Sequence, residues 1–380
     1  MITALIVLLL IVIAFWAVAK FYLEGEDLSR YDRQPAPAVG SAPDGSREPS
    51  TEHHEVLELL GSLNAAGAGA GGTSRLQAMR DAMDAMGDQA DLTDIRIVPV
   101  EADGGDRPVP CEWVLAPNSN PDHRLLYLHG GAFSMGSPRS HRAITTRYAR
   151  MAGVSVLAVD YRLIPENKRI DCLTDCQTVY RWILENGPAG TGPASLLFVC
   201  GDSAGGNLTL AVIAWARDAG LGAATGAIAL SPATDASFAS PSLTSNVTTD
   251  HMLGPMFGRI TRLPRTLVAW FGWVSNRMHP CDPRISPLRG DLSNLPPTLI
   301  HASEAEMLLD DARRYVNKAT EAGSEATLET WHHMLHVWHI FDQQLPEAQE
   351  AFAHIDRFMR LVAPGLAGDG ASGRFDTAGH

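Results

Sequence analysis

Charged side chains are absent from the first nineteen residues, in which Thr3 is the one clearly polar side chain. A helix of that length rises about 28 Å, close to the thickness of the hydrocarbon core of a bilayer. Signal peptides usually have a basic start and a shorter apolar stretch, and this segment has neither, although Ala17-Val18-Ala19 has the form of a cleavage site. We therefore expect residues 1–20 to be a transmembrane anchor, with a cleaved signal segment as the alternative.

Basic residues are scarce, since 30 Lys and Arg stand against 43 Asp and Glu, for a formal net charge of −13. Nucleic-acid binding needs clustered Lys and Arg, so a nucleic-acid partner is not expected. Lys20, Arg30 and Arg33 follow the apolar run and no basic residue precedes it. The positive-inside rule then places the body of the protein in the cytoplasm, with export after signal cleavage as the alternative. Nothing in the sequence indicates the oligomeric state.

The chain has only five cysteines, and their spacing is scattered. An odd number without regular spacing argues against a disulfide framework, and no zinc pattern of paired Cys and His is present. Buried free thiols are the simplest expectation. The five are Cys111, Cys172, Cys176, Cys200 and Cys281.

Small and turn-forming residues are concentrated near the two ends of the chain. Residues 34–50 are rich in Pro, Ala, Gly and Ser, and residues 61–72 form an Ala/Gly tract. We expect residues 21–74 to be a flexible linker region and residues 364–380 to be a disordered tail. Between them, residues 75–363 are expected to form the catalytic domain.

From residue 95 the chain alternates between strand-like and helix-like stretches, and the middle strands are apolar throughout. Such alternation predicts a doubly wound α/β domain whose mostly parallel sheet is covered by helices on both faces. The strand-like runs are residues 95–100, 111–116, 125–129, 155–160, 196–201, 227–231, 298–302 and 326–331. The helix-like stretches are residues 141–152, 173–185, 204–219, 308–322 and 339–361.

The segment Gly201-Asp202-Ser203-Ala204-Gly205 matches G-x-S-x-G, directly after an apolar strand and at the start of a helix. In this context a sharp turn lifts the serine hydroxyl above the sheet, and small neighbours let the backbone turn. Ser203 is therefore the predicted nucleophile. The alternative, a Gly-rich turn with a helix-capping serine, is weakened by the second motif.

That second motif is His129-Gly130-Gly131-Ala132-Phe133, after the third strand-like run. A glycine-rich loop at this place can aim backbone N–H groups at a developing oxyanion. We expect the donors to come from Gly131 and Ala132, joined by Ala204 after the predicted nucleophile, while His129 shapes the loop.

The two motifs and residues 160–166 (DYRLIPE) together resemble the hormone-sensitive-lipase-like branch of the α/β-hydrolases, which includes bacterial esterases and arylacetamide deacetylases. The resemblance covers about residues 75–360 and implies an eight-stranded α/β-hydrolase fold. It also implies a helical cap from about residues 75–92 and 240–280, and ester hydrolysis without a metal or an organic cofactor. Two departures from the family pattern are Ala132 in place of a third glycine, and residues 168–171 (KRID) in place of a Pro-Ala step.

In this fold the acid of the triad follows the seventh strand. Glu306 fits the register of the family pattern, with Glu304 and Asp310 as alternatives. Glu306 also completes a Ser303-x-x-Glu306 capping box, so a purely structural role is open.

The base follows the eighth strand, where four histidines occur close together. The family pattern favours His336, before Val337-Trp338, with His333 as the alternative. Its role would be to take the Ser203 proton and pass it to the leaving alcohol. A Ser203-His336-Glu306 triad acting through an acyl-enzyme on small to medium acyl esters is the leading prediction. An amide hydrolase on the same triad is the alternative, and a non-catalytic small-molecule receptor is disfavoured because all three residues are present.

Residues 246–278 form an apolar segment between the sixth and seventh strands. The segment could wall an acyl pocket or pack the cap on the domain, and the sequence leaves both open. Its large side chains include Met252, Phe257, Leu267, Phe271 and Trp273.

Overall fold

The computed structural model describes residues 1–36, 48–67 and 72–366. Its central sheet has eight strands in the order β1-β2-β4-β3-β7-β8-β9-β10. β2 is antiparallel to both of its neighbours, and the other pairs are parallel. Each strand matches a predicted run. The strands are β1 Arg96–Ala102, β2 Val109–Leu115, β3 Asn120–Leu128, β4 Val154–Val159, β7 Leu196–Asp202, β8 Gly226–Leu230, β9 Thr298–Ser303 and β10 Ala326–Trp331.

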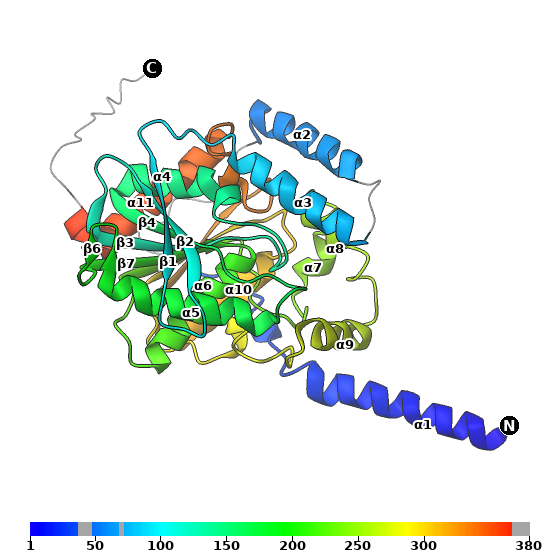
Figure 1. The fold of residues 1–380 in the computed structure, drawn as a ribbon. Helices are drawn as coiled ribbons and strands as arrows, with labels where there is room; N and C mark the ends of the chain where they lie inside the picture. The colour runs from blue at the N-terminus through cyan, green and yellow to red at the C-terminus, as the bar shows by residue number, and fades with distance from the viewer. Residues whose placement is uncertain (37–47, 68–71, 367–380) are drawn as a thin grey trace.

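Helices cover both faces of this sheet (Figure 1). Successive side chains of a strand point to opposite faces, so Leu126 and Leu128 of β3 join one apolar core and Leu125 and Tyr127 join the other. The first core includes helices α5 (Arg169–Glu185), α6 (Ala204–Asp218) and α10 (Leu309–Glu321). The second includes α4 (Arg142–Ala152) and α11 (Pro346–Val362). The predicted α/β-hydrolase architecture is confirmed.

The last helix begins later than expected. Residues 339–361 were predicted to be helical, but α11 starts at Pro346, after a short 3-10 turn, Trp338–Phe341. Proline has no N–H and its ring fixes φ, so it suits the first helical position and disfavours helix just before it. Leu345 is accordingly extended.

A small hairpin of β5 (Asn186–Gly187) and β6 (Gly190–Thr191) was not predicted. It lies against Arg124, whose buried guanidinium donates to the carbonyls of Ile183 and Gly192, each at 2.7 Å. The hairpin depends on this long-range contact, which no local pattern reveals.

The segment expected to be a flexible linker contains structure where it is described. A π-helical turn (Ala19–Leu23), a 3-10 turn (Ser29–Tyr31) and helix α2 (Thr51–Gly67) occur in it. Tyr31 is buried, and its carbonyl accepts a hydrogen bond from Asn317 of α10 at 2.9 Å. The flexible-linker prediction therefore fails at Tyr31, because composition does not show contacts with distant parts of the chain. Residues 37–47 and 68–71, and the predicted tail from 367, lie outside the described residues.

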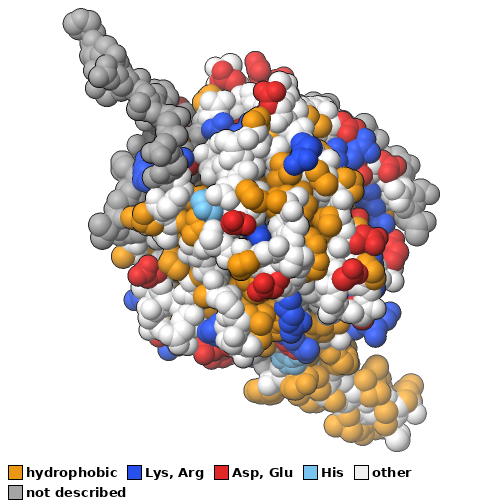
Figure 2. All heavy atoms as spheres, turned by 60° about the vertical axis from the view of Figure 1, so that its left-hand side comes forward, with side chains coloured by type: hydrophobic (Ala, Val, Ile, Leu, Met, Phe, Trp, Pro, Cys, Tyr) orange, Lys and Arg blue, Asp and Glu red, His pale blue; other side chains and the backbone are white. Residues whose placement is uncertain are grey.

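Helix α1 (Ile2–Val18) runs into the π-helical turn and projects away from the body (Figure 2). The continuous helical stretch Ile2–Leu23 contains 18 consecutive residues with a mean hydropathy of 3.0, and these are almost entirely unburied. It is long and apolar enough to cross a membrane, properties that a signal sequence shares.

Further helices lie near the ends of the parallel strands (Figure 1). Helix α3 (Gly72–Gly87) is fixed there by Arg80, which donates to the carboxylate of Glu166 at 2.8 and 2.9 Å. The Nε of Arg80 also donates to the carbonyl of Ser134 at 2.8 Å. Helices α7 (Ser242–Ser245), α8 (Leu253–Phe257) and α9 (Arg265–Asn276) come from the insertion between β8 and β9.

Candidate active site

Ser203 lies in the sharp turn between β7 and α6. Its φ of 53° and ψ of −114° lie outside the regions that L-residues normally adopt. The turn is fixed by a hydrogen bond from the Ser203 N–H to the Leu230 carbonyl of β8 at 2.7 Å. Gly205 is required because a Cβ there would lie 1.9 Å from the carbonyl oxygen of Leu128. The strained turn thus presents Ser203 at the end of the sheet, as the motif predicted.

Three of the predicted site residues meet at this turn. His336 Nε2 lies 2.9 Å from Ser203 Oγ, and His336 Nδ1 lies 2.7 Å from Glu306 Oε2. An ionised carboxylate only accepts hydrogen bonds, so Nδ1 carries the proton. Nε2 is then free to accept the Ser203 hydroxyl proton.

Glu306 uses both of its carboxylate oxygens. Oε2 accepts from His336, while Oε1 accepts the N–H of Ser303 at 2.9 Å. The bond to Ser303 is one half of the capping box seen in the sequence, but α10 begins only at Leu309. Glu306 is therefore not the capping residue of that helix, and the bond to Ser303 instead orients its carboxylate toward His336.

The pair is fully buried, which makes its electrostatics strong. Burial lowers the pKa of His336, but the hydrogen bond and charge of Glu306 outweigh burial, so the net pKa is raised above 6.5. Burial raises the pKa of Glu306, and the contact with His336 opposes that rise. An imidazolium formed at His336 would thus be stabilised by its partner.

The alternative acids point elsewhere. Glu304 lies 3.1 Å from His332 Nδ1 and is partly exposed. The Asp310 carboxylate accepts a hydrogen bond from the Ser242 N–H at 2.8 Å, which ties the insertion between β8 and β9 to α10.

The alternative base, His333, is exposed. The buried His339 lies 3.1 Å from His301, between the rings of Trp338 and Phe352. Among the acid and base candidates, only Glu306 and His336 lie beside Ser203.

The loop after β3 brings unused N–H groups to the same place. Gly131, Ala132 and Phe133 all have positive φ, at 110°, 52° and 61°. Within the described part of the chain, the N–H groups of Gly131 and Ala132 donate no hydrogen bond. Ala204 is the first residue of α6, where a helix N–H has no partner in its own helix. Gly131, Ala132 and Ala204, the predicted oxyanion donors, thus have backbone N–H groups that are free to bind a ligand in the described part of the chain.

Asp202, the residue before Ser203, fixes this loop and was missed at the sequence level. Its Oδ1 accepts the Gly130 N–H at 3.0 Å and the Tyr127 hydroxyl at 2.6 Å. Its Oδ2 lies 3.3 Å from His141 Nε2. Burial raises the pKa of Asp202, but His141 outweighs it, and the net pKa is lowered. Asp202 was visible only as the variable position of G-x-S-x-G, so no pattern distinguished it.

His129 shapes the loop as expected. Its ring stacks on Tyr161 at a centroid distance of 4.2 Å, and the Tyr161 hydroxyl donates to the His129 carbonyl at 2.7 Å. Burial lowers the pKa of His129 to about 3, so the ring is neutral.

The departure at residues 168–171 places Arg169 beneath the oxyanion loop. Its buried guanidinium lies 3.4 Å from the ring centre of Phe133 and donates to Asn207 Oδ1 at 2.6 Å. Asn207 in turn donates to the carbonyls of Ala233 and Ile285. The residues that replace the Pro-Ala step thus connect the loop with α6.

The insertion after β8 supports the loop that carries Glu306, a role that the sequence did not indicate. The Asn246 amide donates to the Glu304 and Glu306 carbonyls, at 2.8 and 2.9 Å. Asp250 Oδ2 accepts the N–H of Met307 at 2.8 Å.

The large side chains of the insertion do not all face the domain. Leu267, Phe271 and Trp273, which we expected to wall a pocket or pack the cap, are exposed. Val268 and Ala269 are buried instead. Helix α9 therefore has an apolar outer face.

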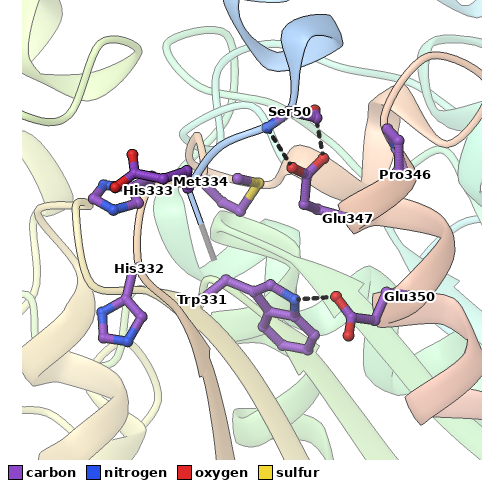
Figure 3. A pocket seen from close by; sticks show the side chains of 9 residues that line it. Ser50, Trp331, His332, His333, Met334, Pro346, Glu347 and Glu350 are labelled. Atoms are coloured by element: carbon purple, nitrogen blue, oxygen red, sulfur yellow. Dashed lines mark hydrogen bonds between the residues drawn. The ribbon is translucent and has the colours of Figure 1, made fainter. Parts of the chain in front are cut away.

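A cavity of about 370 Å³ lies beside the loop of His336 (Figure 3). On one side, the carboxylate of Glu347 accepts hydrogen bonds from the N–H and the hydroxyl of Ser50. The carboxylate of Glu350 accepts a hydrogen bond from Trp331 Nε1 at 3.4 Å. None of Ser203, Glu306 and His336 lines this cavity. Its lining comprises Glu48, Ser50, Trp331, His332, His333, Met334, Pro346, Glu347 and Glu350.

Residues 125–340 match the family model of the alpha/beta hydrolase fold. The chain is 35% identical over 251 residues to an acetyl-hydrolase of Streptomyces hygroscopicus, covering 66% of this chain and 79% of that protein. An esterase of Acinetobacter venetianus is 33% identical, covering 62% of this chain and 73% of that protein.

Solved structures agree with these relatives. An esterase from the bacterial hormone-sensitive lipase family superimposes with a TM-score of 0.70 at 33% identity, covering 83% of this chain and 99% of that one. The family match over residues 125–340 includes strands β4 to β10, both motif loops and the loops that carry Glu306 and His336, while β1 and β2 precede it. The chain is therefore a serine hydrolase of the α/β-hydrolase fold family, in its hormone-sensitive-lipase-like branch.

Proposed function

We propose that this protein is a carboxylic ester hydrolase that acts through Ser203, His336 and Glu306 by way of an acyl-enzyme. The single observation that carries the proposal is the continuous pair of hydrogen bonds from Ser203 Oγ to His336 and from His336 to Glu306, at 2.9 and 2.7 Å. The esterase and acetyl-hydrolase names of the relatives point to the same substrate class, an acyl ester.

In the first step, His336 Nε2 takes the hydroxyl proton of Ser203 as Oγ attacks the ester carbonyl carbon. The carbonyl oxygen becomes an oxyanion and accepts hydrogen bonds from the N–H groups of Gly131, Ala132 and Ala204. His336 then gives its proton to the alkoxy oxygen, the C–O bond breaks, and the alcohol leaves. The acyl group remains on Ser203.

In the second step, His336 takes a proton from water, which attacks the acyl carbon. The tetrahedral intermediate collapses as His336 returns the proton to Ser203 Oγ, and the carboxylic acid leaves. Glu306 keeps Nδ1 protonated throughout and stabilises the imidazolium in both steps. Because the backbone around Ser203 is already strained and fixed, little reorganisation accompanies the reaction.

We further propose that residues 2–19 anchor the protein in a membrane with the catalytic domain on the cytoplasmic side. The length, the mean hydropathy of 3.0 and the low burial of this stretch support a span. Lys20, Arg30 and Arg33 follow it, and basic residues favour the cytoplasmic side.

A chromogenic acyl ester and a fluorophosphonate test the catalytic part. We expect ester turnover with an initial burst of alcohol, the kinetic mark of an acyl-enzyme. Mass spectrometry should find the phosphonyl group on the peptide containing Ser203 and on no other peptide. Matched ester and amide substrates should be cleaved with a strong preference for the ester. A protein that hydrolyses neither, or is labelled elsewhere, contradicts the proposal.

A further inference from the structure

Exposed large apolar side chains are concentrated in one place on the body of the protein. Outside residues 1–23, eight such side chains are exposed among the described residues, and six of these lie between residues 256 and 274. The other two, Leu92 and Leu361, are isolated from them in the sequence. The six are Met256, Leu263, Leu267, Phe271, Trp273 and Val274. Single exposed apolar residues are ordinary, but a group of this size indicates an interaction surface.

Helix α9 carries the centre of this group. Leu267, Trp270, Phe271 and Val274 follow the i, i+3, i+4, i+7 spacing of one helix face. The opposite side of the helix, with Val268 and Ala269, is buried against the domain. The apolar face is therefore additional to the one that packs α9, and Leu267, Phe271 and Val274 on it remain exposed in the folded chain.

The charged side chains within this segment of the sequence all have one sign. Between residues 251 and 281 the chain has four arginines and no Asp or Glu, although the whole chain has a net charge of −13. All four arginines are exposed, and none forms an ion pair with another described residue. They are Arg259, Arg262, Arg265 and Arg277. Aromatic and apolar side chains bordered by arginines match the interface of an anionic bilayer.

The apolar face also continues into α1, beside which α9 lies in Figure 1. The ring of Phe15 stacks on Trp270 at a centroid distance of 4.4 Å, and Trp270 Nε1 donates to the Phe15 carbonyl at 3.1 Å. Tyr22, at the end of the apolar stretch, contacts His279 just after α9. If α1 crosses a bilayer, α9 is held where that bilayer ends, among the aromatic residues typical of the membrane interface.

We propose that α9 and the loop before it, residues 256–277, lie on the surface of an anionic lipid bilayer beside the anchor. The apolar face dips into the boundary between headgroups and acyl chains, and the four arginines contact lipid phosphates. This inference rests on the membrane anchor of the proposed function and adds a second contact to it. A protein partner or a second copy would require an acidic complementary surface, whereas the adjacent α1 already places this face at a lipid interface.

The test uses the full chain in vesicles of phosphatidylcholine and phosphatidylglycerol, with a tryptophan introduced by Phe271→Trp. Subtracting the parent spectrum isolates the emission of that tryptophan. We expect brominated phospholipids to quench it by about half or more. The control is Leu361→Trp, at an even more exposed apolar position on α11, whose added emission should not change. Adding Leu267→Glu and Val274→Glu to the Phe271→Trp variant should abolish the quenching.

Hydrolysis of a water-soluble ester by each variant verifies the fold and reports the esterase activity independently of the membrane. Emission that brominated lipid leaves unchanged would overturn the proposal. So would protection from aqueous iodide without lipid quenching, since a second copy or another protein then covers the face. A parent chain that does not float with the vesicles would refute the anchor and the surface contact together, and leave the esterase standing.

Discussion

Glu306 Oε2 lies 2.7 Å from His336 Nδ1, and both side chains are buried. The other oxygen of Glu306 is held by the Ser303 N–H, so the carboxylate cannot rotate away from the imidazole without breaking two hydrogen bonds. Substitution of Glu306 should therefore change the protonation of His336 and, with it, the activity.

Ser203→Ala should lower kcat on a chromogenic ester by about 10⁴-fold to 10⁶-fold, since the attacking oxygen is lost. The melting temperature should change little, because the turn is held by the backbone of Ser203 and not by its hydroxyl. Substantial turnover by a folded Ser203→Ala protein would remove Ser203 as the nucleophile.

Glu306→Gln should lower kcat by about 10⁴-fold, because the imidazolium loses its anionic partner and the preferred tautomer of His336 changes. Glu304→Gln and Asp310→Asn are the controls and should stay within about tenfold of the parent, as loss of a triad acid costs far more. Asp310→Asn should still lower stability by about 1–3 kcal/mol, because the buried Ser242 N–H loses a charged acceptor. If Asp310→Asn is the variant that loses activity, the acid has been misassigned.

The pH profile of kcat/KM should show an acid limb whose midpoint lies above 6.5. His336 must be neutral to accept the Ser203 proton, and Glu306 raises its pKa. In Glu306→Gln the negative charge that raises the pKa of His336 is lost, while the burial that lowers this pKa persists. The residual activity should therefore extend to lower pH. The same raised pKa stabilises the fold: the contribution is complete below 6.5 and is lost as the pH rises through the folded value. An unchanged midpoint in Glu306→Gln would contradict the coupling.

Arg80→Ala should destabilise the protein by about 1–2 kcal/mol, mainly through the lost hydrogen bonds to the Ser134 and Ile164 carbonyls. The ion pair with Glu166 adds little, since that carboxylate is more than half exposed. Urea unfolding measures the difference. Arg139→Ala removes an exposed ion pair with Asp88, which directly follows α3, and should cost about 0.5 kcal/mol or less. Equal losses in the two variants would show that the carbonyl contacts contribute nothing.

Removing residues 1–18 should release the enzyme from membranes and leave kcat on a soluble ester unchanged. Ala19 and Leu23 are kept because both are buried in the body. Fractionation of cell extracts, with ester hydrolysis as the readout, measures both effects. If the natural full-length protein is soluble and begins at Lys20, the apolar stretch is a cleaved signal segment.

The sequence predicted what depends on local pattern. The eight strands of the sheet and the turn at Ser203 follow from apolar runs and glycine spacing. Glu306 and His336 were chosen by resemblance to the family pattern, within the regions that the order of strands indicates. Contacts between distant residues were not predictable in this way. Asp202 holds Gly130, Asn246 supports the Glu306 loop, and neither has a periodicity or spacing that marks it.

The segment after α1 was misjudged for the same reason. Its small and polar residues suggested a linker, but Tyr31 and Asp32 bind α10, and Gly25 fits where a side chain would meet Cys281. Composition indicates how flexible a segment is in isolation. It does not reveal the contacts with the folded body that order the segment.

The bonds of residues 19–33 to the body have a mechanical consequence. An enzyme joined to a membrane anchor by a flexible linker would reorient freely and could approach its substrate in any orientation. Here Asn317, Arg314 and Arg289 form hydrogen bonds with residues 26–33, soon after α1. These bonds fix the orientation of the body relative to α1. If α1 spans a bilayer, as proposed, the fold sets the height and tilt of the body over the lipid, and a change in the tilt of α1 would change the direction in which the active site faces.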